Sequence, residues 1–172
     1  MTPDVPGGRV DRASRVIRAA RPAIYRALID PQAWVRWLPP EGMSGQVEAF
    51  DQRPGGRYRM VLTYRSADHA TPGKATPERD VVEGRFLELV PDRCVVHAVT
   101  FESADPAFAG TMTMTWGLAD APGGVEVTFT CEDVPRGIGA ADHQTGLRSS
   151  LANLAAYVEP SPGEMAQRPS DA

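Results

Sequence analysis

The sequence has no long hydrophobic run. No segment approaches the roughly 20 consecutive apolar residues of a transmembrane helix. The opening residues, MTPDVPGGRVD, also lack the apolar stretch of a secretion signal. We therefore expect a cytoplasmic protein that does not insert into a membrane. With 172 residues, the chain is long enough for one domain with a substantial core.

Cysteine and histidine are both scarce. The two cysteines, Cys94 and Cys131, lie in separate apolar segments without CxxC spacing, which favours buried, reduced thiols over a disulfide or a zinc site. The three histidines, His69, His97 and His143, lack the short spacings of a metal site. We expect neither a metal nor another cofactor.

An excess of positive charge is also missing. The chain carries 18 basic and 22 acidic residues, which gives a net charge of −4. Its overall field therefore does not attract nucleic acid or an anionic membrane. No Ser-His-Asp or paired-carboxylate motif occurs, and the glycine pair in RPGGR belongs to a turn rather than to a phosphate-binding loop. We expect no nucleic-acid partner, and no catalytic residue is assigned.

One long helical pattern is present, over residues 142–159. Its apolar residues recur at the spacing of a single helix face. Glycines precede the segment and Pro160 follows it, which are ordinary helix boundaries. The apolar stripe consists of Leu147, Leu151, Leu154, Ala155 and Val158.

Seven segments before this helix have the alternation or β-branched content of strands. The first is followed by two short helical segments, each bounded by proline. The expected strands are residues 12–19, 45–51, 58–64, 80–90, 93–101, 111–118 and 125–131, and the expected short helices are 22–29 and 32–38. The predicted domain is 10–159, between disordered ends at 1–9 and 160–172.

Short turns between successive strands predict antiparallel neighbours. The fold class is therefore α+β: a curved antiparallel sheet of about seven strands, two short helices after the first strand, and one long C-terminal helix across the concave face. A curved sheet and a straight helix fit imperfectly, so the gap between them is either filled by side chains or is a ligand cavity. The residues expected to face it are Tyr58, Met60, Tyr64, Met112, Met114, Trp116, Phe129, Leu147 and Leu151, with Trp37 closing one end.

His97 is the one histidine in a strand, and its direction is open. Either Val95, His97 and Val99 face inward, or Cys94, Val96 and Ala98 do. An inward His97 would orient a polar ligand group or act as a general base. The alternatives are a histidine satisfied by the protein or one exposed on the outer face. A thiol nucleophile at Cys131 would require His97 to converge with it in space.

Several segments resemble the START-like, helix-grip superfamily, often called SRPBCC. They include VIRA at 16–19, Asp30-Pro31, the GGRYR hairpin at 55–59, VEGRFLELVP at 82–91, and the closing helix. The branch is similar to the C-terminal domain of the activator of heat-shock-protein ATPase, and the resemblance covers residues 12–159. It implies the helix-grip architecture and a cavity whose contents differ between branches. Gly84, inside a strand, would mark a bulge or the close approach of another element.

The function expected from these patterns is non-enzymatic binding of a hydrophobic or aromatic small molecule between sheet and helix. Tyr58, Tyr64 and His97 would give the ligand polar orientation. One alternative is an enzyme similar to the aromatases and cyclases of the superfamily, which would use the same cavity. Another is a protein that interacts with a chaperone, as the resemblance implies. We expect a monomer or a homodimer.

Overall fold

The computed structural model describes residues 8–40, 42–66 and 74–160. Most of the expected disordered ends, namely residues 1–7 and 161–172, lie outside these residues, as does most of the loop after Tyr64, including His69. The elements are β1 (Val10–Ile17), α1 (Arg21–Ile29), α2 (Pro31–Trp37), β2 (Met43–Phe50), β3 (Arg57–Tyr64), β4 (Arg79–Val90), β5 (Cys94–Phe101), the 3-10 turn η1 (Pro106–Phe108), β6 (Met112–Ala121), β7 (Gly124–Glu132) and α3 (Ala140–Val158).

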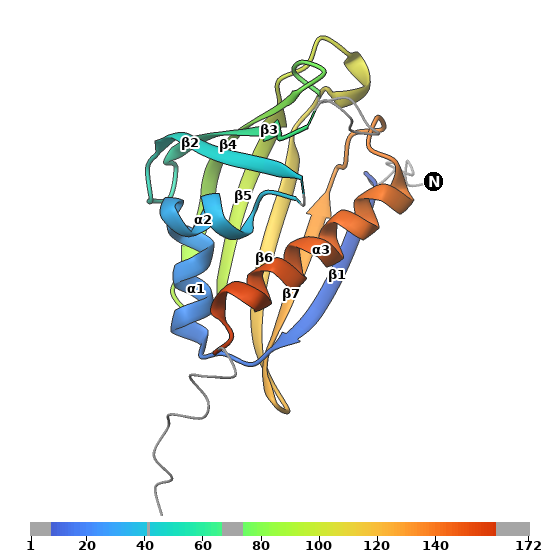
Figure 1. Cartoon of the computed structure of the whole chain (residues 1–172). Coiled ribbons are helices and arrows are strands. Elements are labelled where there is room, and N and C mark those ends of the chain that lie inside the picture. Colours follow the sequence, from blue (N-terminus) through green and yellow to red (C-terminus); the bar gives the residue numbers. More distant parts are fainter. Residues whose placement is uncertain (1–7, 41, 67–73, 161–172) are drawn as a thin grey trace, which may run out of the picture.

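The seven strands form one antiparallel sheet in the order β1-β7-β6-β5-β4-β3-β2. This confirms the α+β helix-grip prediction. Figure 1 shows α3 lying over one face of the curved sheet, with α1 and α2 beside it. Among the described residues, no helix has both the length and the hydrophobicity needed to cross a membrane.

Asp30-Pro31 separates the two short helices, as the sequence predicts. Pro31 opens α2, and the Asp30 carboxylate accepts a hydrogen bond from the backbone N–H of Gln32 at 2.8 Å, which caps the helix. This break turns α2 so that Trp34 and Trp37 are buried. Their indole N–H groups donate to the backbone carbonyls of Leu28 and Ala27, each at 3.0 Å. The two helices therefore form one rigid unit.

The ends of α3 are attached to β1 by two ion pairs. His143 Nδ1 lies 2.6 Å from a carboxylate oxygen of Asp11, and Arg18 Nε lies 3.0 Å from one of Glu159. From residue 143 to 159 a helix rises about 24 Å, and from residue 11 to 18 a strand rises about 23 Å. Because the two lengths match, α3 runs along β1.

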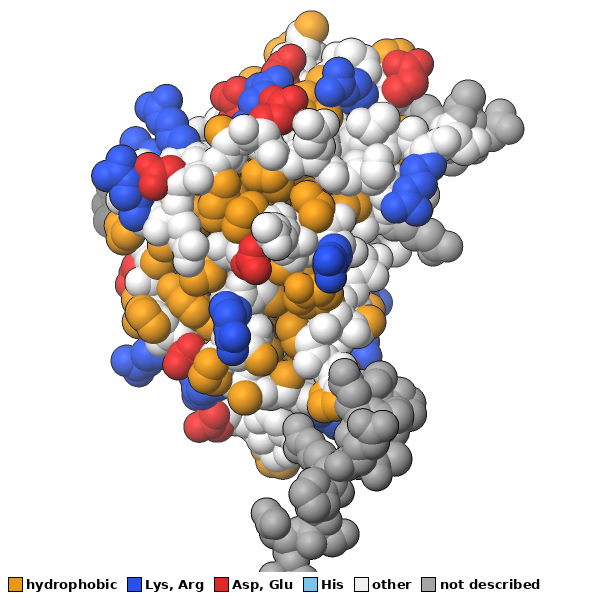
Figure 2. All heavy atoms as spheres, turned by 60° about the vertical axis from the view of Figure 1, so that its left-hand side comes forward, with side chains coloured by type: hydrophobic (Ala, Val, Ile, Leu, Met, Phe, Trp, Pro, Cys, Tyr) orange, Lys and Arg blue, Asp and Glu red, His pale blue; other side chains and the backbone are white. Residues whose placement is uncertain are grey.

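Hydrophobic side chains are also visible on the outside of the molecule. Figure 2 shows the molecule from the side on which α1 and α2 lie. Hydrophobic side chains gather in the middle of this face, with Lys, Arg, Asp and Glu side chains around and between them. The large hydrophobic residues that are more than a third exposed are Val10, Val16, Val35, Leu87 and Tyr157. These residues come from four different elements, β1, α2, β4 and α3, whereas the core proper lies between the sheet and the helices.

Candidate functional site

A cavity of about 570 Å³ lies between the sheet, α2 and the N-terminal part of α3. Its wall is mostly aliphatic, thioether and aromatic, with polar groups toward the start of α3 and around Lys74 and Asp80. The cavity lies where the sequence predicts an imperfect fit between sheet and helix. The part of the wall contributed by α3 lies between Asp142 and Asn153.

The structure places nine of the eleven predicted residues in this wall: Trp37, Tyr58, Met60, His97, Met112, Met114, Trp116, Phe129 and Leu147. Tyr64 and Leu151 are not among the wall residues. Leu151 is buried in the packed core, because the apolar stripe of α3 continues past the end of the cavity. Tyr64 is the last residue of β3, one alternation beyond Leu62, which does contact the cavity.

His97 points inward. Its register partners are Phe86 on β4 and Met114 on β6, and its side chain is 4% exposed. Of the two registers that the sequence leaves open, the structure selects the one with Val95, His97 and Val99 inward. His97 is thus part of the cavity wall rather than of the outer face.

Tyr58 reaches His97 across an intervening strand. Tyr58 lies on β3 and His97 on β5, yet the Tyr58 hydroxyl and His97 Nδ1 are 2.5 Å apart and share a hydrogen bond. The ring crosses β4 at Gly84, where a Cβ would lie 2.0 Å from Tyr58 Cζ. For Gly84 the sequence predicts either a bulge or the close approach of another element, and the structure shows the close approach. The nearby register shift lies between Phe86 and Glu88.

Aromatic rings surround this pair. The ring centroids of Trp34, Tyr58 and Phe86 lie 6.2, 5.6 and 6.0 Å from that of His97. The residues predicted for the site included Trp37 but not Trp34. The spacing of Trp34 and Trp37 at i and i+3 on a short helix was the available signal, since it places both on one face.

Burial keeps both members of the pair neutral. It lowers the pKa of His97 to about 4 and raises that of Tyr58 far above its ordinary value. His97 Nε2 is buried and has no hydrogen-bond partner among the described residues. The pair therefore offers one unused polar atom in a largely apolar wall.

A second polar pair lies at the start of α3. Burial would raise the pKa of Asp11, but hydrogen bonds from His143 and Arg9 outweigh it and lower the pKa below its ordinary value. His143 contacts the cavity, whereas its partner Asp11 is on β1. By register, Asp11 is opposite Cys131, Cys131 is opposite Met114, and Met114 is opposite His97. The backbones of Asp11 and His97 are therefore about 14 Å apart, at ~4.8 Å per strand.

Cys131 contacts the cavity from β7, but it is not close to His97. β6 lies between their strands, and burial raises the pKa of the Cys131 thiol to about 12. A thiol in that state is not a nucleophile at neutral pH. The described residues hold no group of three or more His, Cys, Asp or Glu side chains suited to a metal ion.

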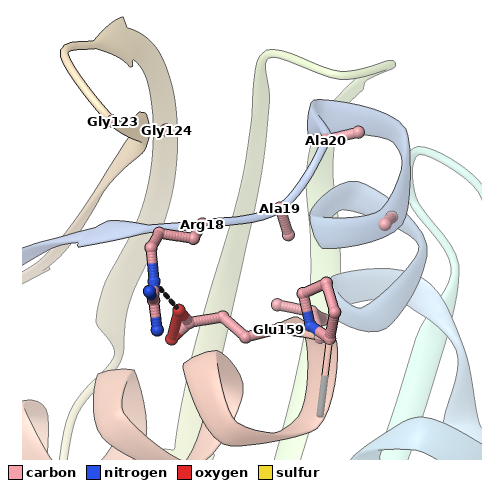
Figure 3. A pocket seen from close by; sticks show the side chains of 9 residues that line it. Arg18, Ala19, Ala20, Gly123, Gly124 and Glu159 are labelled. Atoms are coloured by element: carbon pink, nitrogen blue, oxygen red, sulfur yellow. Dashed lines mark hydrogen bonds and ion pairs between the residues drawn. The ribbon is translucent and has the colours of Figure 1, made fainter. Parts of the chain in front are cut away.

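A second hollow, of about 590 Å³, lies where the end of α3 meets the end of β1 (Figure 3). Short side chains and backbone line it, including Ala19, Ala23 and Gly124. Its two charged groups, Arg18 and Glu159, are already bonded to each other, and Arg18 is mostly exposed. It thus lacks the buried, unpaired polar atom of the inner cavity.

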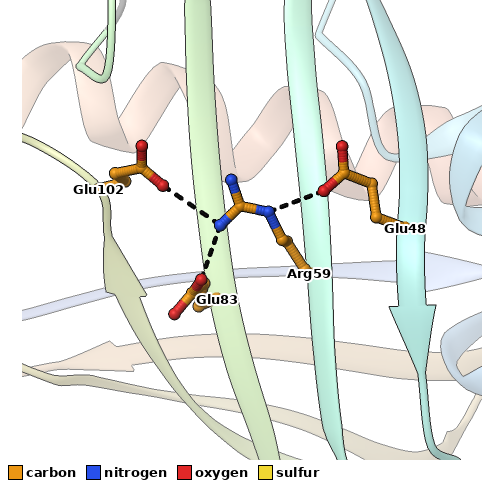
Figure 4. Close-up of polar contacts among 4 residues, drawn as sticks. All are labelled: Glu48, Arg59, Glu83 and Glu102. Carbon is orange, nitrogen blue, oxygen red and sulfur yellow. Dashed lines mark hydrogen bonds and ion pairs between the residues drawn. The ribbon is translucent and has the colours of Figure 1, made fainter.

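The outer face of the sheet carries one cluster of charges. Arg59 bonds Glu48, Glu83 and Glu102 at 2.7, 2.6 and 3.2 Å, on the side of the sheet turned away from α3 (Figure 4). The carboxylates are exposed and share one guanidinium, so the cluster joins neighbouring strands at their surface. Exposed ion pairs of this kind contribute little to stability and are not a ligand site.

Comparison with known proteins identifies relatives of this architecture. The family described as Activator of Hsp90 ATPase homolog 1-like protein matches residues 18–159. Among solved structures, protein CV1439 from Chromobacterium violaceum is 34% identical with a TM-score of 0.76, covering 88% of this chain and 98% of its own. The AHSA1-like protein from Aeromonas hydrophila is 18% identical with a TM-score of 0.66, and the match covers 87% of this chain and 92% of that protein. At this identity the similarity shows the fold alone. No curated protein matches.

The family match begins at the end of β1 and ends one residue after α3, so it includes every element that contributes to the cavity wall. The matched range also contains Gly84, Tyr58 and His97, the residues of the buried hydrogen bond. Because the match covers well over half of the chain, this protein belongs to the Activator of Hsp90 ATPase homolog 1-like family, with a START-like helix-grip domain.

Proposed function

We propose that this protein binds a hydrophobic or aromatic small molecule in the cavity between sheet and α3, without converting it chemically. The observation that carries this proposal is the cavity itself. Its volume of about 570 Å³ falls within the ~300–1,000 Å³ typical of small-molecule sites, and its wall is mostly apolar. Removal of the ligand's apolar surface from water would drive binding.

The polar groups of the wall favour binding over catalysis. A histidine whose pKa is about 4 is a weak base at neutral pH, so His97 is poorly suited to take a proton from a ligand. The Cys131 thiol is protonated and does not reach His97. A cyclase-like or aromatase-like reaction would require an acid and a base on the same part of the ligand, whereas the backbones of Asp11 and His97 are three strand spacings, about 14 Å, apart.

The test uses the neutral fluorescent probe N-phenyl-1-naphthylamine, whose emission rises in an apolar environment. The wild-type protein should bind it with saturation. Met114→Trp should weaken binding by about tenfold or more, equivalent to ~1.4 kcal/mol, because the larger ring occupies part of the cavity.

The matched control is Thr113→Trp, one residue earlier on β6. Successive side chains of a strand point to opposite faces, so this ring lies outside the cavity and probe binding should stay unchanged. Both variants should unfold cooperatively, which circular dichroism checks. Failure of the folded wild type to bind, or equal binding by Met114→Trp, would overturn the proposal.

A further inference from the structure

The hydrogen-bond arrangement at His97 determines which polar atom is left for a ligand. The imidazole is neutral, so one ring nitrogen carries a proton and the other is an acceptor. Tyr58 keeps its hydroxyl proton, and its hydroxyl bonds Nδ1. Nε2 is buried and has no partner among the described residues.

One of the two tautomers satisfies more groups. If the Tyr58 hydroxyl donates to Nδ1, the proton of His97 is on Nε2, and this N–H is the single unused donor. If Nδ1 donates to Tyr58 instead, both the hydroxyl proton and Nε2 are left without partners. Because each unpaired buried polar group is costly, the first arrangement is favoured. His97 therefore presents an N–H donor.

The surroundings of this donor are neutral. Aromatic rings lie around His97, and the other basic side chains of the described wall already have partners: Lys74 is bonded to Asp80 at 3.3 Å and His143 to Asp11 at 2.6 Å. A carboxylate brought to Nε2 would be buried without a cation in contact, which is strongly unfavourable. A neutral acceptor oxygen meets the donor without that cost.

We infer that the ligand of this cavity is an apolar or aromatic molecule with a neutral acceptor oxygen, such as a ketone, ester or ether, which accepts a hydrogen bond from Nε2 of His97. This inference rests on the proposed function, since it specifies the ligand of the same cavity. Tyr58 acts as a positioning residue, because its hydroxyl keeps Nδ1 in the acceptor state.

The experiment compares three probes of similar size by calorimetry. They are 2-acetylnaphthalene, which has a ketone, 2-isopropenylnaphthalene, which replaces that oxygen by carbon, and the anion 2-naphthoate. The measured quantity is the ratio of ketone to hydrocarbon affinity. His97→Phe should lower this ratio by about fivefold or more, the effect of losing one buried hydrogen bond. 2-Naphthoate should bind the wild type more weakly than the ketone.

Tyr58→Phe should also lower the ratio, because Nδ1 loses its donor and the tautomer is no longer fixed. The matched control is Tyr157→Phe, which removes a hydroxyl from an exposed tyrosine of α3 outside the cavity wall and should leave the ratio unchanged. If both naphthalenes bind and the ratio is the same in His97→Phe, the inference is overturned and the proposed function stands. If neither binds, both are overturned.

A measurement on the wild type alone covers the case in which a variant fails to fold. Nitrogen NMR of histidine-labelled protein should show His97, identified by its contacts with Tyr58, as the tautomer protonated on Nε2. The ketone should shift the Nε2 proton resonance, and the hydrocarbon should not. Protonation on Nδ1, or equal shifts with both probes, would overturn the inference.

Discussion

Gly84 permits the hydrogen bond between Tyr58 and His97 because it has no side chain. The Tyr58 ring occupies the position that a Cβ at residue 84 would take, which allows it to pass from β3 over β4 to β5. Interiors are close-packed, so even one added carbon at such a contact forces side chains or backbone to move. The placement of the wall residues Tyr58 and His97 thus depends on Gly84, a glycine that is not itself part of the wall.

Gly84→Ala should destabilise the protein by about 1–3 kcal/mol, the usual cost of overpacking, and should break the Tyr58–His97 bond. Urea unfolding measures the free energy. Gly117→Ala on β6 is the matched control, because a Cβ there has no neighbour within 4 Å. It should change stability by less than about 0.5 kcal/mol. Equal effects of the two substitutions would contradict this account of Gly84.

Burial of neutral His97 makes stability depend on pH. A histidine in the unfolded chain has a pKa near 6.5, whereas that of folded His97 is about 4. Between these values the unfolded state binds more protons, so stability decreases as pH falls from about 6.5 to 4 and is constant above that range. The loss at pH 4 reaches about 3 kcal/mol, at ~1.36 kcal/mol per pKa unit.

Urea unfolding of the wild type and His97→Phe between pH 4.5 and 7.5 checks this sign and size. The variant should lose less stability on acidification, because it has no imidazole to protonate at this position. The remaining ionisable groups are the same in both proteins, so the difference between the two curves isolates His97. Parallel curves would show that His97 is not the group responsible.

The direction of His97 could not be derived from the sequence. Both alternating sets of β5 are apolar apart from His97 and Thr100, so alternation does not distinguish the faces. The register is set by pairing with β4 and β6, including the shift between Phe86 and Glu88. Lys74 was likewise missed as a wall residue, because it lies within a polar loop that has no periodicity.

At the scale of elements, the ion pairs at the two ends of α3 differ in burial. The side chains of Asp11 and His143 are mostly buried, whereas that of Arg18 is 70% exposed. Exposed pairs contribute between about 0 and 1 kcal/mol, while a charge-assisted hydrogen bond with less water around it contributes more. The start of α3, next to the cavity, is therefore the more strongly attached end.

Double-mutant cycles test this difference. Asp11→Asn with His143→Gln should give a coupling free energy of about 1.5 kcal/mol, and Arg18→Gln with Glu159→Gln one below about 0.5 kcal/mol. Since the pKa of Asp11 is lowered, its contribution should be present at neutral pH and lost as pH falls through the folded pKa. A larger coupling at the Arg18 end would contradict the assignment.

Elements were the most predictable level of this structure. Every helix and strand was expected from periodicity, prolines and turn residues, and most boundaries agree with the structure within two residues. The alignment of α3 with β1 was not predicted, although the sequence placed the helix across the concave face: its two ends are bonded to Asp11 of β1 and to Arg18 just after it. Contacts between residues more than 130 positions apart leave no local pattern in a sequence.

At the scale of the molecule, the interior is filled at one end and hollow at the other. Leu154 and Ala155 of α3 are completely buried and lie outside the cavity wall, whereas Leu147, two turns earlier, contacts the cavity. Each end of α3 thus has a different role. The C-terminal end packs into the core, and the N-terminal end covers the cavity.

Leu154→Ala and Leu147→Ala compare the two ends by the same substitution on the same helix. Leu154→Ala should cost about 3–5 kcal/mol, because it opens a new cavity in a packed region. Leu147→Ala should cost less, since that side chain already borders empty space and loses fewer contacts. Urea unfolding measures both, and an equal or larger loss at Leu147 would contradict a hollow N-terminal end.

Lys74 is the single lysine of the sequence, and its partly exposed ammonium group lies within 6 Å of the ring centres of Phe101 and Phe108. Because it also borders the cavity, an amine-directed dye would label one lysine side chain there in addition to the α-amino group of the chain, and the two sites could be distinguished by peptide mapping. The native chain thus already contains a position for an optical sensor, whose colour or lifetime would report occupancy without any engineered residue.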